Sequence, residues 1–303
     1  MRQLLLNKAI NLFKSETTQV GVLLMFAGTA GSFLNFAYHF VIGRMLGPAD
    51  YAALVALISV LATVSAPMGV SQALLSDVTA RLLVLDGKGQ IRQFLRRFVG
   101  ALGLLAIVVM GAIALASGQI SQFMNLTSRA PVFVLALTLG PALILPALSG
   151  SLQGWQDFQG MSIAGLIGPV MRLTAGAGLV WLGFGVSGAL GGFLVSGLVV
   201  AGFTAFLLAR RLIDVPPQPS AVTLKELIQF SLQVALATLA FAALTNTDVV
   251  FARHFFPAEQ AGHYSAAATL GKIVLFLPGP VATLMFPKAS ARHAAGASRT
   301  SML

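Results

Sequence analysis

Two cationic residues lie deep within apolar stretches of the sequence. Arg172 stands in GLIGPVMRLTAGAG, and Lys272 stands beside Leu270 and Ile273. An arginine at the centre of a membrane-spanning helix costs about 2.5–3.5 kcal/mol, so Arg172 should face a cavity or a partner. A guanidinium can bind phosphate oxygens in a bidentate manner. Arg172 is therefore a candidate for binding a phosphorylated substrate, with a structural pair as the alternative. Lys272 either adds positive potential to the same cavity or extends its long stem to the interface.

A polar cluster lies near the outer end of the seventh apolar stretch. Thr245, Asn246 and Asp248 belong to the segment TNTDVV. One carboxylate among amide and hydroxyl oxygens suits Na⁺, which prefers oxygen ligands, or a proton that the carboxylate binds and releases. The cluster is predicted to couple transport to such an ion, and the alternative is a polar contact between helices.

Two short segments of the sequence resemble each other. Residues 41–50 read VIGRMLGPAD and residues 250–259 read VFARHFFPAE, so that Arg44 corresponds to Arg253 at an offset of 209 residues. An offset of six membrane spans would leave both copies in the same orientation, as in transporters built from parallel repeats. The two arginines either contribute to substrate binding or gating, or stabilise their turns by pairing with the acidic residue that ends each segment.

The composition excludes a soluble protein. Of 303 residues, 57% are hydrophobic and 9% are charged, whereas soluble domains carry about 25% charged residues. The net charge of +10 comes from basic residues between apolar stretches, where anionic lipid head groups account for them, and no nucleic-acid site is expected. The chain has no cysteine, its four histidines form no metal-ligand cluster, and no nucleophile–base pair is recognisable. Neither an enzyme, a cofactor nor a metal site is predicted.

A membrane-spanning helix needs roughly 20 mostly apolar residues. The sequence contains eight such stretches, at about 18–42, 51–75, 98–118, 131–151, 161–184, 186–209, 230–252 and 264–286. With the N-terminus in the cytoplasm, 14 of the 19 Lys and Arg residues fall on the inner side and three on the outer side. This asymmetry is what the positive-inside rule requires, and it supports the number of spans.

The predicted fold class is therefore an all-α integral membrane protein of about eight transmembrane helices, with one complete six-helix lobe and the first two helices of a second. The chain is expected to begin with an interfacial amphipathic helix (1–16), followed by a first lobe (17–209) and a cytoplasmic linker (210–229). Two helices of a second lobe (230–290) and a polar tail (291–303) complete it. A six-span repeat implies a protein of twelve or fourteen spans, so the chain is expected to be C-terminally truncated.

Small residues and prolines within the spans predict local geometry. Ala27, Gly28 and Gly31 in the first span, and the pair Gly188 and Gly192 at GxxxG spacing, are expected to let helix backbones approach closely. Pro67 and the other prolines within spans are expected to kink their helices, because each removes a backbone donor.

The segments GRMLGPADYAALVAL, TDVVFARHFFPAEQAGHYSAAATLGKIV and LMFPKAS resemble the polysaccharide (O-antigen) flippases of the multidrug/oligosaccharidyl-lipid/polysaccharide exporter superfamily. The resemblance implies two six-helix lobes around a cavity that opens alternately to each side. It also implies that an undecaprenyl-diphosphate-linked oligosaccharide moves from the inner to the outer leaflet of a bacterial inner membrane, for lipopolysaccharide or another polysaccharide, without ATP hydrolysis by the protein. In related flippases an acid near the position of Asp248 serves cation coupling.

Three alternatives remain at this point. A multidrug antiporter of the same superfamily would need acidic residues in its cavity, and the first lobe has Arg172 without an embedded acid nearby. A membrane-bound glycan polymerase or ligase would need a large outer loop, and every outer turn here is short. A non-transporting remnant or assembly partner is the third.

The predicted partners are a lipid-linked glycan, an anionic bilayer and the proteins of glycan polymerisation and export.

Overall fold

The computed structural model describes residues 16–219 and 224–276, and the side chains of 23–219 and 231–272. Over these residues the chain is helical with no strand, which confirms the predicted all-α class. The predictions for the amphipathic N-terminal helix at 1–16 and for the polar tail at 291–303 lie outside the described residues.

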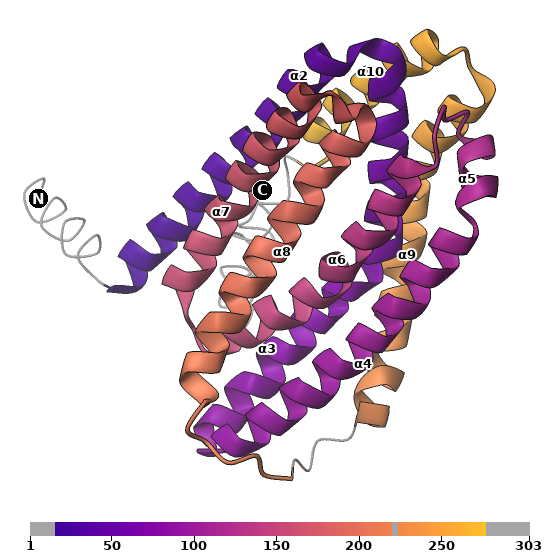
Figure 1. The fold of residues 1–303 in the computed structure, drawn as a ribbon. Coiled ribbons are helices and arrows are strands. Elements are labelled where there is room, and N and C mark those ends of the chain that lie inside the picture. Colours follow the sequence, from indigo (N-terminus) through magenta and orange to yellow (C-terminus); the bar gives the residue numbers. More distant parts are fainter. Residues whose placement is uncertain (1–15, 220–223, 277–303) are drawn as a thin grey trace, which may run out of the picture.

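The helices follow one another through short turns (Figure 1). In chain order they are α2 (Glu16–Ser65), a 3₁₀ turn η1 (Ala66–Met68), α3 (Gly69–Val84), α4 (Lys88–Leu115), α5 (Ser117–Phe123), α6 (Ala130–Gly154), α7 (Phe158–Leu179), a π-helical turn η2 (Val180–Phe184), α8 (Gly185–Leu212), α9 (Leu224–Phe255) and α10 (Ala258–Phe276).

Five helical stretches of the described chain are long and apolar enough to cross a membrane. Two of them, Leu23–Val84 and Phe158–Leu212, have 62 and 55 residues, far more than the roughly 20 that one crossing needs. Each folds back on itself at glycines with positive φ, Gly47 (φ 74°) in the first and Gly183 (φ 90°) in the second. These bends divide each stretch into two crossings, and α10 begins the eighth predicted span.

Some predicted boundaries are wrong. The second span was expected to end near residue 75, but the chain stays helical through α3 to Val84, with a 3₁₀ turn at the expected kink around Pro67. The helix α6 runs through Pro141 and Pro146 without interruption, so these prolines do not break it. The linker predicted at 210–229 is shorter, because α8 continues to Leu212 and α9 begins at Leu224. The short helix α5 was not predicted.

The apolar core is divided between the two ends of the bundle. One cluster of buried side chains, which includes Tyr38, Leu54 and Leu190, lies toward the end with the Gly47 bend. The other, which includes Leu82 and Phe94, lies toward the end where α3 turns into α4. Large apolar side chains such as those of Ile107 and Leu115 are exposed on α4, as a lipid-facing surface requires.

Close glycine contacts hold several helices together. A Cβ atom on Gly192 of α8 would lie 2.6 Å from the carbonyl oxygen of Arg172 on α7, and one on Gly150 of α6 would collide with the carbonyl of Gln72 on α3. These contacts confirm the close approach predicted for Gly192. In the first span, a Cβ atom on Gly31 would lie 3.1 Å from the carbonyl oxygen of Gly165 on α7, as expected, whereas one on Gly28 has nothing within 4 Å.

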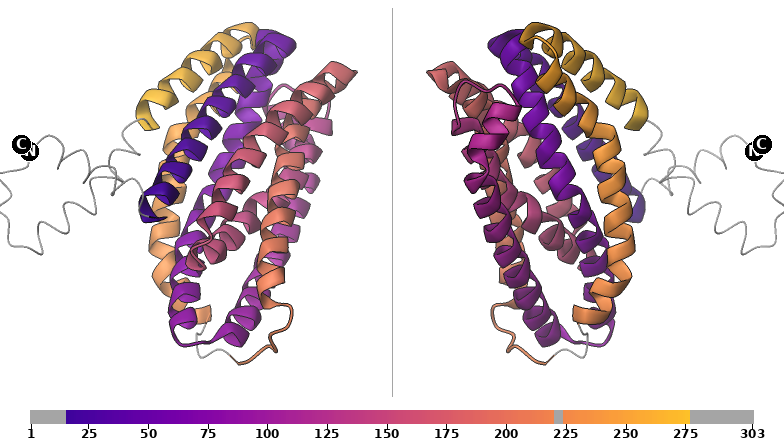
Figure 2. Two further views of the ribbon diagram at one scale, coloured as in Figure 1. Left: turned by 90° about the vertical axis from the view of Figure 1, so that its left-hand side faces the viewer. Right: turned by 90° about the vertical axis from the view of Figure 1, so that its right-hand side faces the viewer.

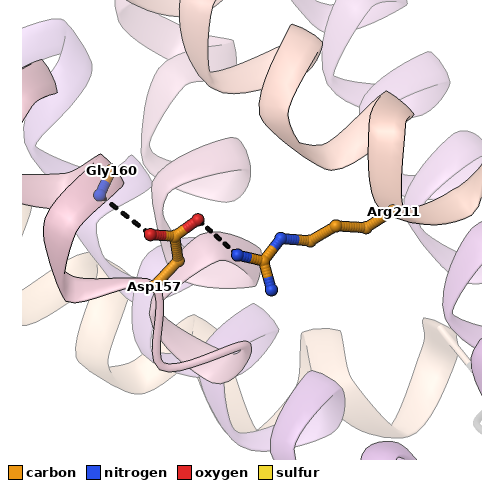
Figure 3. Close-up of polar contacts among 3 residues, drawn as sticks. All are labelled: Asp157, Gly160 and Arg211. Atoms are coloured by element: carbon orange, nitrogen blue, oxygen red, sulfur yellow. Dashed lines mark hydrogen bonds and ion pairs between the residues drawn. The ribbon is translucent and has the colours of Figure 1, made fainter.

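The end of the bundle opposite the Gly47 bend carries most of the described basic residues. Asp157 caps the first turn of α7 by accepting a hydrogen bond from Gly160 N (2.8 Å), and its second carboxylate oxygen binds Arg211 of α8 at 2.6 Å (Figure 3). Arg92 of α4 donates to the carbonyl of Val215 at 2.5 Å and thereby attaches the residues that follow α8 to α4. The Lys and Arg residues that were assigned to one side of the membrane thus gather at one end of the bundle.

The two helices that follow the linker pack against the N-terminal side of the bundle. Views from two further directions show α9 and α10 beside α2, with α7 and α8 across from them (Figure 2). The helix α7 in turn packs most extensively against α8 and α2. The long helix α2 therefore contacts both the first lobe and the helices predicted to begin the second.

Candidate functional site

A cavity of about 540 Å³ lies between the second half of α2 and the helices α3, α6, α7 and α8. Its wall is largely apolar, with a few polar side chains from Ser65, Gln72, Thr138, Ser149, Arg172, Ser196 and Thr204. All of these residues belong to the lobe predicted at 17–209, so the cavity is internal to that lobe.

Arg172 is held in this cavity by two neighbours. Its Nη1 donates to Oδ1 of Asn35 at 2.7 Å, and its guanidinium lies over the ring of Phe193, with Cζ 4.2 Å from the ring centroid. Phe193 is fixed by an edge-on contact with Tyr38, whose hydroxyl donates to the carbonyl of Ala189 at 2.9 Å. The side chain is thus partly buried, oriented by its surroundings and directed into the protein rather than into lipid.

Among the residues that the structure describes, no carboxylate pairs with Arg172. The ion pairs in the described part of the chain are Arg81–Asp77 and Arg211–Asp157, and neither involves it. The residues that line the cavity include no Asp or Glu. The Nε of Arg172 is buried without a hydrogen-bond partner among the described residues. Burying a cationic group with an unpaired N–H donor costs free energy unless a ligand accepts a hydrogen bond from it. The position of Arg172 therefore favours an anionic ligand in this cavity.

The hydroxyl groups of the cavity wall present oxygen acceptors. Four of them donate their own proton to a helix carbonyl at 2.7–2.8 Å, namely those of Ser65, Thr138, Ser196 and Thr204. A hydroxyl that has used its proton still has lone pairs to accept a hydrogen bond. The wall can therefore receive donors such as the hydroxyl groups of a sugar, beside a single cation that can receive an anion.

Arg253 lies elsewhere, at the contact between α9 and α5. Its side chain is 7% exposed, and it donates from Nε to the carbonyl of Met124 and from Nη2 to that of Asn125, both at 2.9 Å. His254 accompanies it, stacked on Phe123 at 4.1 Å between ring centroids. Because backbone carbonyls accept hydrogen bonds from its guanidinium, Arg253 connects α9 to the residues that follow α5. Among the described residues it forms no ion pair with Glu259 or another acid, so the pairing predicted as its alternative role is not seen.

The polar cluster of α9 is divided between two contacts. Lys272 Nζ donates to Oδ1 of Asn246 at 2.8 Å, whereas Asp248 is exposed and accepts from the hydroxyl of Tyr264 at 3.0 Å. Thr245 donates to the carbonyl of Phe241 at 2.9 Å. The structure therefore brings Lys272 and Asn246 together and holds Asp248 apart. Among the described residues no three acidic or histidine side chains gather as metal ligands.

Arg44 lines a separate and smaller cavity between α2 and α10. Its guanidinium lies over the ring of Phe40, 4.6 Å from the centroid, and it forms no ion pair with Asp50. The pairing predicted as its alternative role is therefore absent here too. The four cations considered for substrate binding, Arg172, Lys272, Arg44 and Arg253, thus lie in four different surroundings.

Asn35, Tyr38 and Phe193 were not predicted as parts of the site. Asn35 is a polar amide inside an apolar span, three residues before Tyr38 and four before His39. That run of polar groups on one helix face is a signal of an internal polar site. Phe193 carried no signal, because an aromatic residue in a spanning helix is ordinary.

The arrangement of helices is that of a known class of membrane transporter. The structure is similar to "Inward-facing conformation of a multidrug resistance MATE family transporter of the MOP superfamily", with a TM-score of 0.64 and 18% identity over 80% of this chain. It is also similar to MATE in complex with Br-NRF (TM-score 0.60, 20% identity, 80% of this chain). A third similar structure is "Reverse polarity of binding pocket suggests different function of a MOP superfamily transporter from Pyrococcus furiosus Vc1 (DSM3638)" (TM-score 0.56, 19% identity, 80% of this chain).

At 18–20% identity these likenesses establish the fold. The chain spans 56–58% of the length of these three proteins. A search of curated proteins returned no match. The sequence profile of a family described as "Polysaccharide biosynthesis protein" matches residues 41–301. The chain therefore belongs to the polysaccharide biosynthesis protein family and is a multi-pass membrane protein with the fold of the MOP superfamily, as its sequence motifs predicted.

Proposed function

We propose that this chain forms part of a transporter that moves an undecaprenyl-diphosphate-linked oligosaccharide from the inner to the outer leaflet of a bacterial inner membrane by alternating access. The observation that carries the proposal is Arg172, the one charged residue in the wall of the 540 Å³ cavity, which pairs with no carboxylate of the described residues. The family, which is one of polysaccharide biosynthesis, agrees with a glycan substrate.

The chemistry of the cavity fits the two polar parts of such a substrate. A diphosphate would satisfy the guanidinium of Arg172, and sugar hydroxyl groups would donate to the hydroxyl oxygens on α2, α6 and α8. The polyprenyl tail would remain among the apolar side chains and lipid around the bundle. Proteins of glycan polymerisation and export would receive the product on the outer side.

A multidrug antiporter is the second candidate, because the similar structures include multidrug MATE transporters. A cationic drug would meet the positive charge of Arg172 with no acid in the cavity wall to offset it. Electrostatics therefore favour the anionic substrate. Coupling to Na⁺ or H⁺ through Asp248, with Asn246 and Thr245, remains a proposal. In this structure Asn246 already accepts from the ammonium of Lys272, so an ion on this oxygen would have to displace that ammonium.

The test is a leaflet-exchange assay with the purified chain in proteoliposomes. A fluorescent polyprenyl-diphosphate oligosaccharide is placed in both leaflets, and an impermeant reductant bleaches the outer one. We expect the parent chain to expose the inner pool, and Arg172→Gln to slow this exposure at least about tenfold, because one charge-assisted phosphate contact is lost.

Arg210→Gln is the matched control, since Arg210 is an exposed arginine on α8 that lies outside the cavity wall. It should exchange lipid at the parent rate. Equal rates for the parent and Arg172→Gln would remove Arg172 from the mechanism. Binding of the lipid-linked glycan without any exchange would instead identify the chain as a non-transporting assembly partner.

A further inference from the structure

The second cavity, of about 300 Å³, lies where α10 crosses the bend of α2. Its α2 wall includes His39 and Arg44 before the bend and Tyr51 after it, and its α10 wall includes His263 and Thr269. The two helices are fixed to each other here, because the backbone of Gly262 on α10 lies against the carbonyl of Pro48 on α2. The cavity is therefore a built feature of the helix crossing.

Nitrogen donors predominate among the polar groups of this cavity. Arg44, His39 and His263 contribute nitrogen atoms, and the wall includes no Asp or Glu. The hydroxyl of Thr269 already donates its proton to the carbonyl of Ser265 at 2.8 Å and can only accept. Arg44 is in neither ion pair of the described chain. The ring of Phe40 supports one face of its guanidinium at 4.6 Å and leaves the N–H edge for a ligand. A planar donor edge of this kind matches the oxygens of a phosphate.

The wall is preorganised across the bend. His39 Nδ1 and the hydroxyl of Tyr51 lie 3.2 Å apart, and their rings meet edge to face, with centroids 6.2 Å apart. This contact connects the two halves of α2 on either side of Gly47. A ligand that contacts Arg44 would therefore find a site with a fixed shape, so little of its binding energy would be spent on ordering.

The surroundings indicate that the phosphate is carried on a lipid. Phe36, Phe40 and Leu270 line the same cavity and are 43%, 53% and 55% exposed, which leaves their apolar surfaces for hydrocarbon. The position also fits, because Arg44 lies three residues before the bend at Gly47, at the end of the bundle opposite most of the described basic residues. An inorganic anion would use the donors and leave these apolar surfaces uncovered.

We infer that the cavity between α2 and α10 binds the phosphate group of a membrane lipid, with Arg44 and His263 as its principal donors. The source of the phosphate is either a resident anionic phospholipid or a polyprenyl phosphate. The site is distinct from the Arg172 cavity, and it does not depend on the proposed transport. A bound lipid here would connect α2 of the first lobe with α10 through a shared ligand.

The test is native mass spectrometry of the chain released from neutral detergent and titrated with lipid. All measurements use an Arg172→Gln background, so that the other cavity contributes no phosphate binding. The probes are phosphatidylglycerol, undecaprenyl phosphate and inorganic phosphate. We expect one lipid per chain to bind saturably, about tenfold more weakly in Arg44→Gln and severalfold more weakly in His263→Gln. Arg44→Lys should recover part of the loss.

Arg129→Gln is the matched control, because Arg129 is an exposed arginine at the same end of the bundle and outside the cavity. It should bind lipid within about twofold of the parent. Tighter binding of undecaprenyl phosphate than of phosphatidylglycerol would identify the carrier lipid as the ligand, and equal binding would identify any anionic lipid. Equal losses in Arg44→Gln and Arg129→Gln, with both variants melting as the parent does, would overturn the inference. Inorganic phosphate bound as tightly as the lipids would also overturn it.

Discussion

Arg253→Ala is expected to lower the free energy of unfolding by about 3 kcal/mol, the sum of two charge-assisted hydrogen bonds at the lower end of their range. The guanidinium of Arg253 binds the carbonyls of Met124 and Asn125, which follow α5 and have no helical partner of their own. Its removal leaves both carbonyls unsatisfied and separates α9 from the first lobe. The loss can be measured by denaturant unfolding of the purified chain in mixed micelles.

Two further variants distinguish the contribution of the two carbonyl contacts of Arg253 from that of its positive charge alone. Arg253→Lys keeps the charge but not the two-pronged geometry, and it should recover about half of the stability. Arg129→Ala removes an exposed arginine at the same end and should cost less than about 0.5 kcal/mol. Similar losses in Arg253→Ala and Arg129→Ala would show that the carbonyl contacts do not stabilise the protein.

Gly192→Ala is the second substitution with a large expected effect. The added methyl group would lie 2.6 Å from the carbonyl oxygen of Arg172 and 2.8 Å from the backbone of Gly176, so α7 and α8 would have to separate. Overpacking of this kind costs about 1–3 kcal/mol. The shift also moves Arg172 relative to Phe193, so ligand binding in the cavity should weaken together with stability. A melting curve and a binding titration on the same preparation measure both effects.

Gly178→Ala is the matched control on α7, because a Cβ atom there has nothing within 4 Å. Alanine is the better helix former, so this variant should be as stable as the parent or slightly more stable. If Gly192→Ala also melts at the parent temperature, the close α7–α8 approach is not a constraint on the fold.

The fold could be predicted from sequence where it depends on length and polarity. Apolar stretches of membrane length and the one-sided distribution of Lys and Arg are properties that the bilayer itself imposes. The bends at Gly47 and Gly183 could be anticipated from glycine-rich turns between spans. The helix α5 could not, because a seven-residue polar helix at the end of α4 has no apolar periodicity of its own.

The surroundings of the charged residues were harder to predict. Arg44 and Arg253 occupy matching positions in similar sequence segments, yet one is exposed over Phe40 and the other is buried. The difference arises because the end of α5 covers the last turn of α9, a contact between residues 129 positions apart in sequence. The residues around Arg253 in the sequence do not predict this contact with the end of α5. Arg172 was predictable because its cost in lipid demands an internal position wherever the neighbouring helices lie.

The central claim is that the cavity around Arg172 selects an anionic diphosphate. The most direct measurement is a calorimetric titration of the purified chain with farnesyl diphosphate and, separately, with the lipophilic cation tetraphenylphosphonium. Both titrations use an Arg44→Gln background, so that the site between α2 and α10 does not contribute. We predict saturable binding of farnesyl diphosphate that weakens at least about tenfold on adding Arg172→Gln, and no binding of the cation. Tight binding of the cation, or farnesyl diphosphate binding that is unchanged by Arg172→Gln, would contradict the account.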